Sequence, residues 1–247
     1  MKKYLLLALF FFCIDTQGAE LIAHRGIAPG FKENTLAAIK ESWMLGADAV
    51  EIDLRISSDG VVYLFHDDEI DAGYVRDFEY LQLNAILTDI EIPTLSSVLN
   101  LGTPSGFYIL DLKDHDERMK NALIAVVAQT SFPATKLVVQ SHDIDLLVSI
   151  RETLPDAKYS FLTSLKREMS LLNSANPTDI ASTLKQYDID HIAAKGRSFI
   201  DRLFVDEFRN RGICFYVWTI NDSSRVDYYS QIGVDGVITD ILATLKE

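Results

Sequence analysis

The sequence is poor in basic residues. Of its 247 residues, 23 are Lys or Arg and 36 are Asp or Glu, so the formal net charge at pH 7 is -13. Nucleic acids and anionic membranes bind proteins through clusters of positive side chains. We therefore expect neither as a partner. An anionic small-molecule substrate would have to be held by a few local cations or by a metal.

Proline and glycine are also scarce, with 6 and 12 residues respectively. No stretch is rich in them, so nothing marks a flexible linker, and no repeat of fixed period is present. The length suits one barrel or two small domains and is sufficient to bury a large core. We therefore expect one domain over residues 19–247.

The chain also lacks an N-terminal apolar run long enough for a transmembrane helix. Its candidate, Tyr4–Ile14, has eleven residues, whereas a spanning helix needs about 20. Two lysines precede this run, and the small residues Gly18 and Ala19 follow it, which is the pattern of a signal peptide. We expect residues 1–18 to be a signal peptide. The mature protein would then be periplasmic or secreted, without a stable membrane anchor.

From Ala19 onward, strand-like and helix-like segments alternate. Leaving out one short return strand, eight strands are expected, and this alternation is typical of a parallel (β/α)₈ barrel, or TIM barrel. The expected strands are Leu21–His24, one strand holding Glu51 and Asp53, Gly106–Lys113, Leu137–Ser141, Tyr159–Leu162, His191–Ala194, Ile213–Thr219 and Val237–Thr239. The expected additions are a hairpin after the second strand, an irregular insertion over Asp67–Glu91 and a short helix after it. Helical stretches are also expected around Arg167–Asn173 and Thr178–Tyr187.

Acidic side chains share one face of the second strand. Glu51 and Asp53 are two residues apart, so both point to the same side of the strand. Two bare carboxylates so close repel each other, which implies either a shared proton or a cation between them. Oxygen ligands favour calcium, magnesium or manganese. A hard divalent cation is the simpler interpretation.

A tight turn follows this strand. Ser57-Ser58-Asp59-Gly60 is too short for a crossover between parallel strands and predicts a hairpin, with Val61–His66 returning antiparallel. With Asp59 and Gly60 as a two-residue loop, Ser58 pairs with Val61. This register places His66 opposite Asp53, beside the carboxylates.

Five short motifs follow one another in the first part of the chain. They are His24-Arg25-Gly26, Glu33-Asn34-Thr35, Glu51-x-Asp53, Ser57-x-Asp59-Gly60 and His66-Asp67. Their order and similar spacing make the sequence resemble the glycerophosphodiester phosphodiesterases, a family within a wider superfamily that includes phosphatidylinositol-specific phospholipase C. The resemblance implies hydrolysis of a glycerophosphodiester to an alcohol and sn-glycerol 3-phosphate on a TIM barrel.

The expected site residues fall into three groups. His24 and His66 would be the general acid and base, because imidazole titrates near neutrality, although the sequence does not assign which is which. Glu51, Asp53 and Asp111 would bind one divalent cation, Ca²⁺ or Mg²⁺. Arg25 and Lys113 would hold phosphoryl oxygens, and Trp218 matches an aromatic residue that the family has near the substrate.

The chain departs from the family pattern at two places. It has Asp111-x-Lys113 where the family normally has Glu-x-Lys, so one proposed ligand is shorter by a methylene group. It also lacks the Arg-Thr-Thr/Ser-Asn-Gly-like run that usually follows the second histidine motif. The part of the pocket nearest the alcohol is therefore expected to differ.

Several alternatives stay open at this point. The carboxylates could form a structural ion-pair cluster, and Asn34 could simply cap a helix. The chain could be a phospholipase acting on lysophospholipids or sphingolipids, or a catalytically silent phosphodiester-binding barrel. A glycosidase fits less well, since its two carboxylates should flank a sugar.

Overall fold

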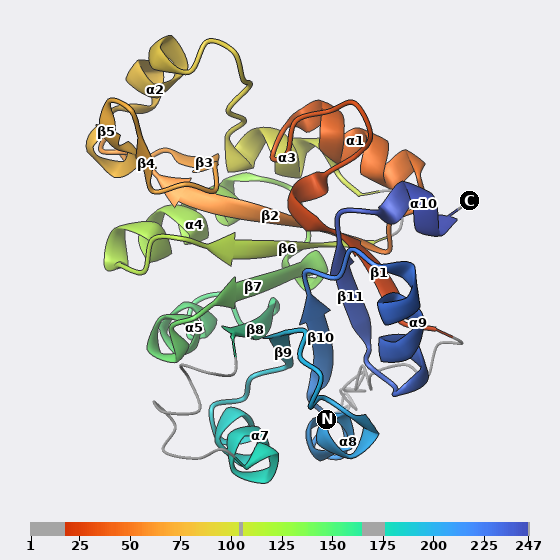
Figure 1. The fold of residues 1–247 in the computed structure, drawn as a ribbon. Coiled ribbons are helices and arrows are strands. Elements are labelled where there is room, and N and C mark those ends of the chain that lie inside the picture. The colour runs from red at the N-terminus through yellow and green to blue at the C-terminus, as the bar shows by residue number, and fades with distance from the viewer. Residues whose placement is uncertain (1–17, 104–105, 165–175, 247) are drawn as a thin grey trace, which may run out of the picture.

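The computed structural model describes residues 18–103, 106–164 and 176–246, and these form a closed parallel barrel surrounded by helices (Figure 1). Strand β1 pairs with both β2 and β11, which closes the ring of eight parallel strands. The strands are β1 (Glu20–Ala23), β2 (Ala49–Ile56), β6 (Phe107–Leu112), β7 (Leu137–Ser141), β8 (Lys158–Thr163), β9 (His191–Lys195), β10 (Cys214–Trp218) and β11 (Gly236–Thr239). The TIM-barrel prediction is confirmed.

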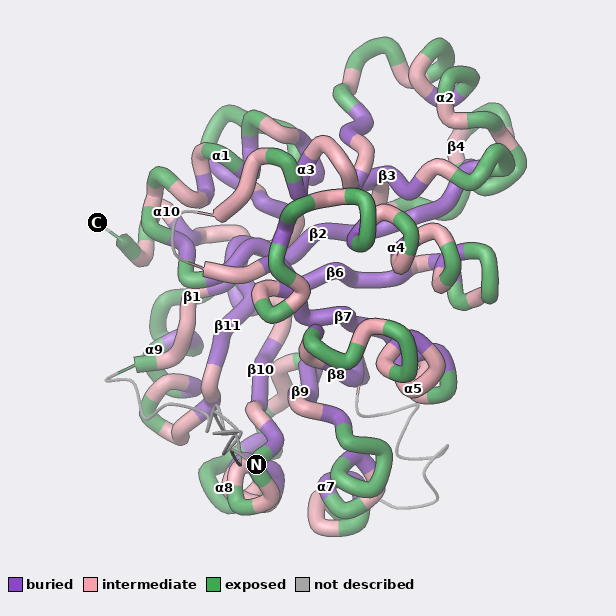
Figure 2. The backbone as a smooth tube through the Cα atoms, turned by 180° about the vertical axis from the view of Figure 1, so that it is seen from behind, coloured by how far each residue is buried: buried purple, intermediate pink, exposed green. Residues whose placement is uncertain are grey.

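Helices cover the outside of the barrel, and Figure 2 shows exposed residues on their outer faces and buried residues along the strands. The helices are α1 (Leu36–Met44), α2 (Tyr80–Ile86), α3 (Leu95–Leu101), α4 (Glu117–Gln129), α5 (Ile144–Arg151), α7 (Pro177–Gln186), α8 (Arg202–Arg209), α9 (Ser223–Gln231) and α10 (Leu242–Lys246). The helix expected around Thr178–Tyr187 is thus α7. The stretch Arg167–Asn173 and, apart from Gly18, the expected signal peptide lie outside the described residues. Within the described ranges, no helix is both long and apolar enough to cross a membrane.

Two apolar layers hold the barrel together. Outward-facing strand residues such as Val50, Ile52 and Leu54 pack against the helices, whereas Ala49 and Ile109 belong to a smaller cluster inside the barrel. Fully burying one side chain of the size of leucine stabilises the fold by about 1.5–3 kcal/mol. Along β2 the side chains that face the inside of the barrel are Ala49 and then the carboxylates Glu51 and Asp53. The same pattern that builds the core therefore directs polar side chains into the barrel.

The hairpin after β2 is present, but its predicted register is wrong by one residue. Strand β3 (Val62–Leu64) runs antiparallel to β2, and Ile56 pairs with Val62. The Ser57 backbone N–H donates to the Val61 carbonyl at 3.1 Å, so three residues form the loop instead of two. Gly60 adopts φ +86°, a conformation that favours glycine and suits a three-residue hairpin loop.

The shifted register changes the partner of Asp53. Its carbonyl accepts a hydrogen bond from the Phe65 backbone N–H at 3.2 Å, and His66 lies one residue beyond that point. A slip of one residue exchanges the two faces of a strand. In this register His66 is not the cross-strand partner of Asp53, so strand pairing does not place His66 beside the carboxylates.

The segment after the hairpin is more regular than expected. It contains a second small hairpin, β4 (Glu69–Ile70) with β5 (Gly73–Tyr74), followed by helix α2. Tyr63, Val75 and Leu83 bury their side chains together in a separate apolar cluster. Strands of two residues are too short to show a periodic pattern, so the sequence did not reveal them. The short helix expected after the insertion is confirmed as α3.

Titratable side chains meet at the amino-terminal end of the barrel. The Tyr216 hydroxyl donates to Glu20 at 3.0 Å, and the Tyr216 ring stacks on His191 with ring centres 5.1 Å apart. Burial, only partly offset by the Tyr216 hydrogen bond, raises the pKa of Glu20 to about 7. Folding thus favours the protonated form of Glu20.

This raised pKa predicts a pH-dependent stability that Glu20→Gln removes. The contribution of Glu20 is fully present below the ordinary pKa of 4.5 and is lost as the pH rises through about 7. Glu20→Gln stays neutral, so we expect its melting temperature to exceed that of the wild type at pH 8 by about 2–4 °C, equivalent to about 1 kcal/mol. At pH 4 the two should melt alike. Glu69→Gln, which changes an exposed glutamate, is the control, and an equal effect of the two substitutions contradicts the assignment.

Candidate active site

Three carboxylates lie together at the carboxyl end of the barrel. Glu51 and Asp53 come from the inner face of β2, and Asp111 from the neighbouring strand β6, where it pairs in register with Asp53. One oxygen of each lies within 4.8 Å of the others, and all three residues are buried. The structure brings these three predicted residues into one group.

Two cations contact this group. The Lys113 ammonium lies 2.8 Å from Asp53 and also contacts Asp111. Arg25 Nε lies 3.3 Å from Asp53, close enough for an ion pair although its geometry makes no hydrogen bond. Burial acts to raise the pKa of Asp53, but Lys113 and the other donors outweigh it and hold the pKa below its ordinary value.

Glu51 is the carboxylate with the least compensation. It accepts a hydrogen bond from the Arg25 backbone N–H at 2.8 Å. Burial and the charge of Asp53 raise the pKa of Glu51 to about 8. Three carboxylates share two permanently charged cations here, so Glu51 would hold a proton at neutral pH unless a further cation were bound.

The donor set fits a hard divalent cation. Its three side chains offer carboxylate oxygens, the ligands that Ca²⁺ and Mg²⁺ prefer. A cation beside Glu51 would balance the excess negative charge and keep Glu51 ionised. The shorter side chain of Asp111 still reaches the other two carboxylates.

The turn after β1 positions Arg25. This residue adopts φ +53°, which is uncommon for a side chain with a Cβ atom and costs about 1–3 kcal/mol. The conformation turns the Arg25 N–H toward Glu51, and the Arg25 carbonyl accepts from the Asn34 N–H at 2.7 Å. The Arg25 guanidinium also donates to Glu33 at 2.8 Å.

Asn34 belongs to the site and does not cap the helix. Its side-chain amide donates to the Asp53 carboxylate at 2.8 Å, and its carbonyl accepts from the Asp53 backbone N–H at 3.1 Å. Thr35 caps α1 instead, by accepting from the Ala38 N–H. The helix-cap interpretation of Asn34 is wrong because Thr35 occupies the cap position and the Asn34 side chain is bonded to Asp53 instead.

His24 is oriented by a carboxylate that is not among the predicted site residues. Its Nδ1 lies 2.6 Å from Asp240, which follows the last barrel strand and also accepts from Asn221. Burial acts to lower the pKa of His24, but the Asp240 hydrogen bond and the charge of Glu51 outweigh it and raise the pKa. Because barrel closure places β11 beside β1, the fold could have identified this pair.

His66 and Trp218 do not contact the carboxylate group through any interaction found in the described residues. His66 follows β3 and hydrogen-bonds through Nδ1 to Asp67 at 2.8 Å, and its carbonyl accepts from the buried Arg55. Trp218 ends β10, and its indole N–H donates to the Ala193 carbonyl at 2.9 Å. Both lie at the same end of the barrel as the carboxylates.

Comparison with known proteins agrees with this geometry. A model described as "Glycerophosphoryl diester phosphodiesterase family" matches residues 24–244. The chain belongs to this family. It is therefore a phosphoric diester hydrolase, and the family assignment made from its motifs is confirmed.

Among its family relatives, a glycerophosphodiester phosphodiesterase of Caldanaerobacter subterraneus subsp. tengcongensis is 25% identical over 91% of this chain and 95% of its own. A crystal structure of the Thermotoga maritima glycerophosphodiester phosphodiesterase aligns with a TM-score of 0.76 and 25% identity, covering 92% of this chain and 96% of that one. An Oleispira antarctica phosphodiesterase, solved with the product sn-glycerol-3-phosphate, shares the fold with a TM-score of 0.76 and 24% identity, covering 93% and 96%.

The His24–Asp240 contact predicts the effect of Asp240→Asn. Removal of the carboxylate charge should lower the pKa of His24, because the neutral amide no longer stabilises the imidazolium. NMR titration of the His24 ring in metal-free protein measures this shift. Asp227→Asn, on the exposed face of α9, should leave the titration unchanged. An unaltered pKa in Asp240→Asn would mean that the contact does not govern His24.

Proposed function

We propose that this phosphodiesterase hydrolyses glycerophosphodiesters to an alcohol and sn-glycerol 3-phosphate with one divalent cation, Ca²⁺ or Mg²⁺, held by Glu51, Asp53 and Asp111. The observation that carries the proposal is the buried carboxylate group with too few cations to balance it. The product bound to the Oleispira phosphodiesterase and the name of the Caldanaerobacter relative support the substrate class.

Lys113 and Arg25 suit the binding of phosphoryl oxygens. Both lie beside Asp53, and both side chains are partly accessible, with 20% exposure. A bound cation would stabilise the negative charge that develops on the phosphoryl oxygens. The guanidinium of Arg25, held by Glu33 and Asp53, can present its remaining N–H groups to an oxyanion.

The two histidines suit proton transfer through the same ring atom. Nδ1 of His24 faces Asp240 and Nδ1 of His66 faces Asp67, so in each ring Nε2 remains for the substrate. Cleavage of a phosphodiester must deprotonate a nucleophile and protonate a leaving alkoxide. One histidine serves each need. The N-terminal apolar run extends the proposal to an exported enzyme, periplasmic or secreted.

Metal dependence is the first test of this proposal. Chelator should abolish hydrolysis of glycerophosphocholine, and Glu51→Gln should abolish both hydrolysis and binding of Ca²⁺ or Mg²⁺ measured by calorimetry, because the buried oxygen ligand is lost. Asp145→Asn removes one acidic charge from the exposed face of α5 and should behave like the wild type. Full turnover by metal-free enzyme in excess chelator would refute the metal role.

Replacement of the histidines tests the proton transfers. His24→Ala and His66→Ala should each lose about 10²–10⁴-fold in kcat, the usual contribution of a general acid or base. A nitrophenyl leaving group needs little protonation, so it should rescue only the variant that lacks the acid. His115→Ala, in an exposed position, is the control. Near-normal turnover of a glycerophosphodiester by both active-site variants would contradict the mechanism.

A further inference from the structure

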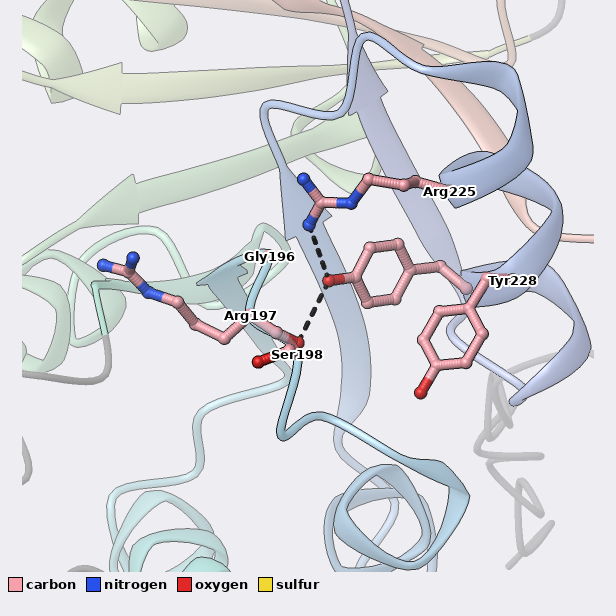
Figure 3. A pocket seen from close by; sticks show the side chains of 6 residues that line it. Gly196, Arg197, Ser198, Arg225 and Tyr228 are labelled. Atoms are coloured by element: carbon pink, nitrogen blue, oxygen red, sulfur yellow. Dashed lines mark hydrogen bonds between the residues drawn. The ribbon is translucent and has the colours of Figure 1, made fainter.

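At the carboxyl end of the barrel, arginine side chains hold different partners. In the pocket of about 630 Å³ lined by α9 and the loop after β9, Arg225 donates to the Tyr229 hydroxyl at 3.1 Å, and Tyr229 donates to the Arg197 carbonyl at 3.2 Å (Figure 3). The Arg197 guanidinium points away from these rings (Figure 3). These contacts hold the pocket wall together. Arg55, in contrast, holds the backbone of His66, a histidine of the proposed mechanism.

Arg55 donates two hydrogen bonds to one oxygen atom of the His66 backbone. Its Nε and Nη2 atoms lie 3.1 and 2.8 Å from the His66 carbonyl oxygen. Arg55 comes two residues after Asp53 on β2, so its side chain leaves the strand on the same face as the carboxylates. The side chain is buried, with 8% exposure. Hydrogen bonds from a charged donor are stronger than those between neutral groups, and here they replace the water that the guanidinium has lost.

Asp114 fixes the guanidinium in this position. It follows Lys113 just after β6, is buried, and accepts from Arg55 Nη1 at 3.3 Å and from the Ile56 backbone N–H at 2.9 Å. An arginine keeps its charge when it is buried, so it needs a partner of this kind. The Arg55–Asp114 pair therefore joins the segment of His66 to β2 and β6, the two strands that carry the carboxylate group.

The segment that carries His66 has little other support. The pairing of β3 with β2 ends before it, and the Phe65 backbone N–H makes the last contact with β2, to the Asp53 carbonyl at 3.2 Å. The His66 side chain is 36% exposed and contacts the adjacent Asp67, which moves with it. In the part of the chain that the structure describes, the hydrogen bonds from residue 66 to another element are those with Arg55.

We propose that Arg55 is a positioning residue for the reaction, which sets the place of His66 relative to the carboxylate group. The inference rests on the proposed function, in which His66 transfers a proton. Such a transfer needs heavy atoms about 2.6–3.2 Å apart, and a displacement of about 1 Å can cost about 100-fold in rate. Arginine suits this task better than lysine, because its planar fork reaches the His66 carbonyl with two N–H groups and Asp114 with a third.

Replacement of Arg55 by lysine tests the inference. Arg55→Lys keeps a positive charge beside Asp114 but loses the fork, so kcat for glycerophosphocholine should fall about 10- to 100-fold. KM and the affinity for Ca²⁺, measured by calorimetry, should stay unchanged, because the oxygen ligands are intact. In a His66→Ala background the same replacement should lower kcat no further, since Arg55 acts through His66. Additive losses would overturn the inference.

Two further variants separate this role from a loss of folding. Arg55→Gln combined with Asp114→Asn removes both hydrogen bonds to His66 without leaving an unpaired buried charge, and it should show the same loss of kcat. Arg118 is the matched control, because its guanidinium donates to the Ser57 carbonyl at 2.7 Å and so holds the same hairpin at its loop. Arg118→Lys should keep the kcat of the wild type. An equal loss in this control would overturn the specific role of Arg55.

The order of the His66 backbone can be measured without any substrate. NMR relaxation of the metal-free protein should give an order parameter of about 0.85 for the His66 amide in the wild type, and a value nearer about 0.6 in Arg55→Lys. An unchanged order parameter contradicts the inference. If the wild type hydrolyses no glycerophosphodiester, the proposed function is wrong, and the order parameter still decides whether Arg55 fixes His66.

Discussion

The excess of buried negative charge at the barrel mouth is the constraint on which the site depends. A carboxylate removed from water is costly unless cations or hydrogen bonds replace the solvent. Asp53 meets this requirement through Lys113, Arg25 and Asn34. At Asp111 burial outweighs the contact with Lys113 and raises the pKa, and at Glu51 burial and the charge of Asp53 do the same. The group therefore carries more negative charge than its cations balance, and it could bind a divalent cation.

The same constraint explains the unusual backbone between β1 and α1. Arg25, Gly26 and Asn34 all adopt positive φ values, and two of these residues carry Cβ atoms. The conformations direct one backbone N–H to Glu51 and one amide side chain to Asp53. The strained backbone of the loop thus supplies hydrogen-bond donors to buried carboxylates. Such strain persists where the surrounding contacts hold the residue in place. The loop and the strand carboxylates depend on each other.

The sequence predicted the positions of site residues correctly where these follow from the alternation of side chains along a strand. Glu51 and Asp53 could be placed on one face because the period of a strand is two, and Asp111 followed from the same pattern in β6. The hairpin register could not be obtained this way, since it depends on whether Ser57 or Ser58 closes the loop, and both are serines. The contact between His24 and Asp240 was not predicted, because it spans 216 residues and forms only when the barrel closes. The β4–β5 hairpin has too few residues to show a period.

The distribution of cations bears on how a chain with a net charge of -13 can bind an anion. Its overall field repels an anionic substrate, and salt screens that repulsion beyond about 10 Å. Attraction must then come from cations that lie within a few ångströms of the bound molecule. Lys113 and Arg25 are already shared with carboxylates, which reduces the positive potential they can offer. A divalent cation held by Glu51, Asp53 and Asp111 would therefore supply much of the attraction that an anionic phosphodiester needs at this site.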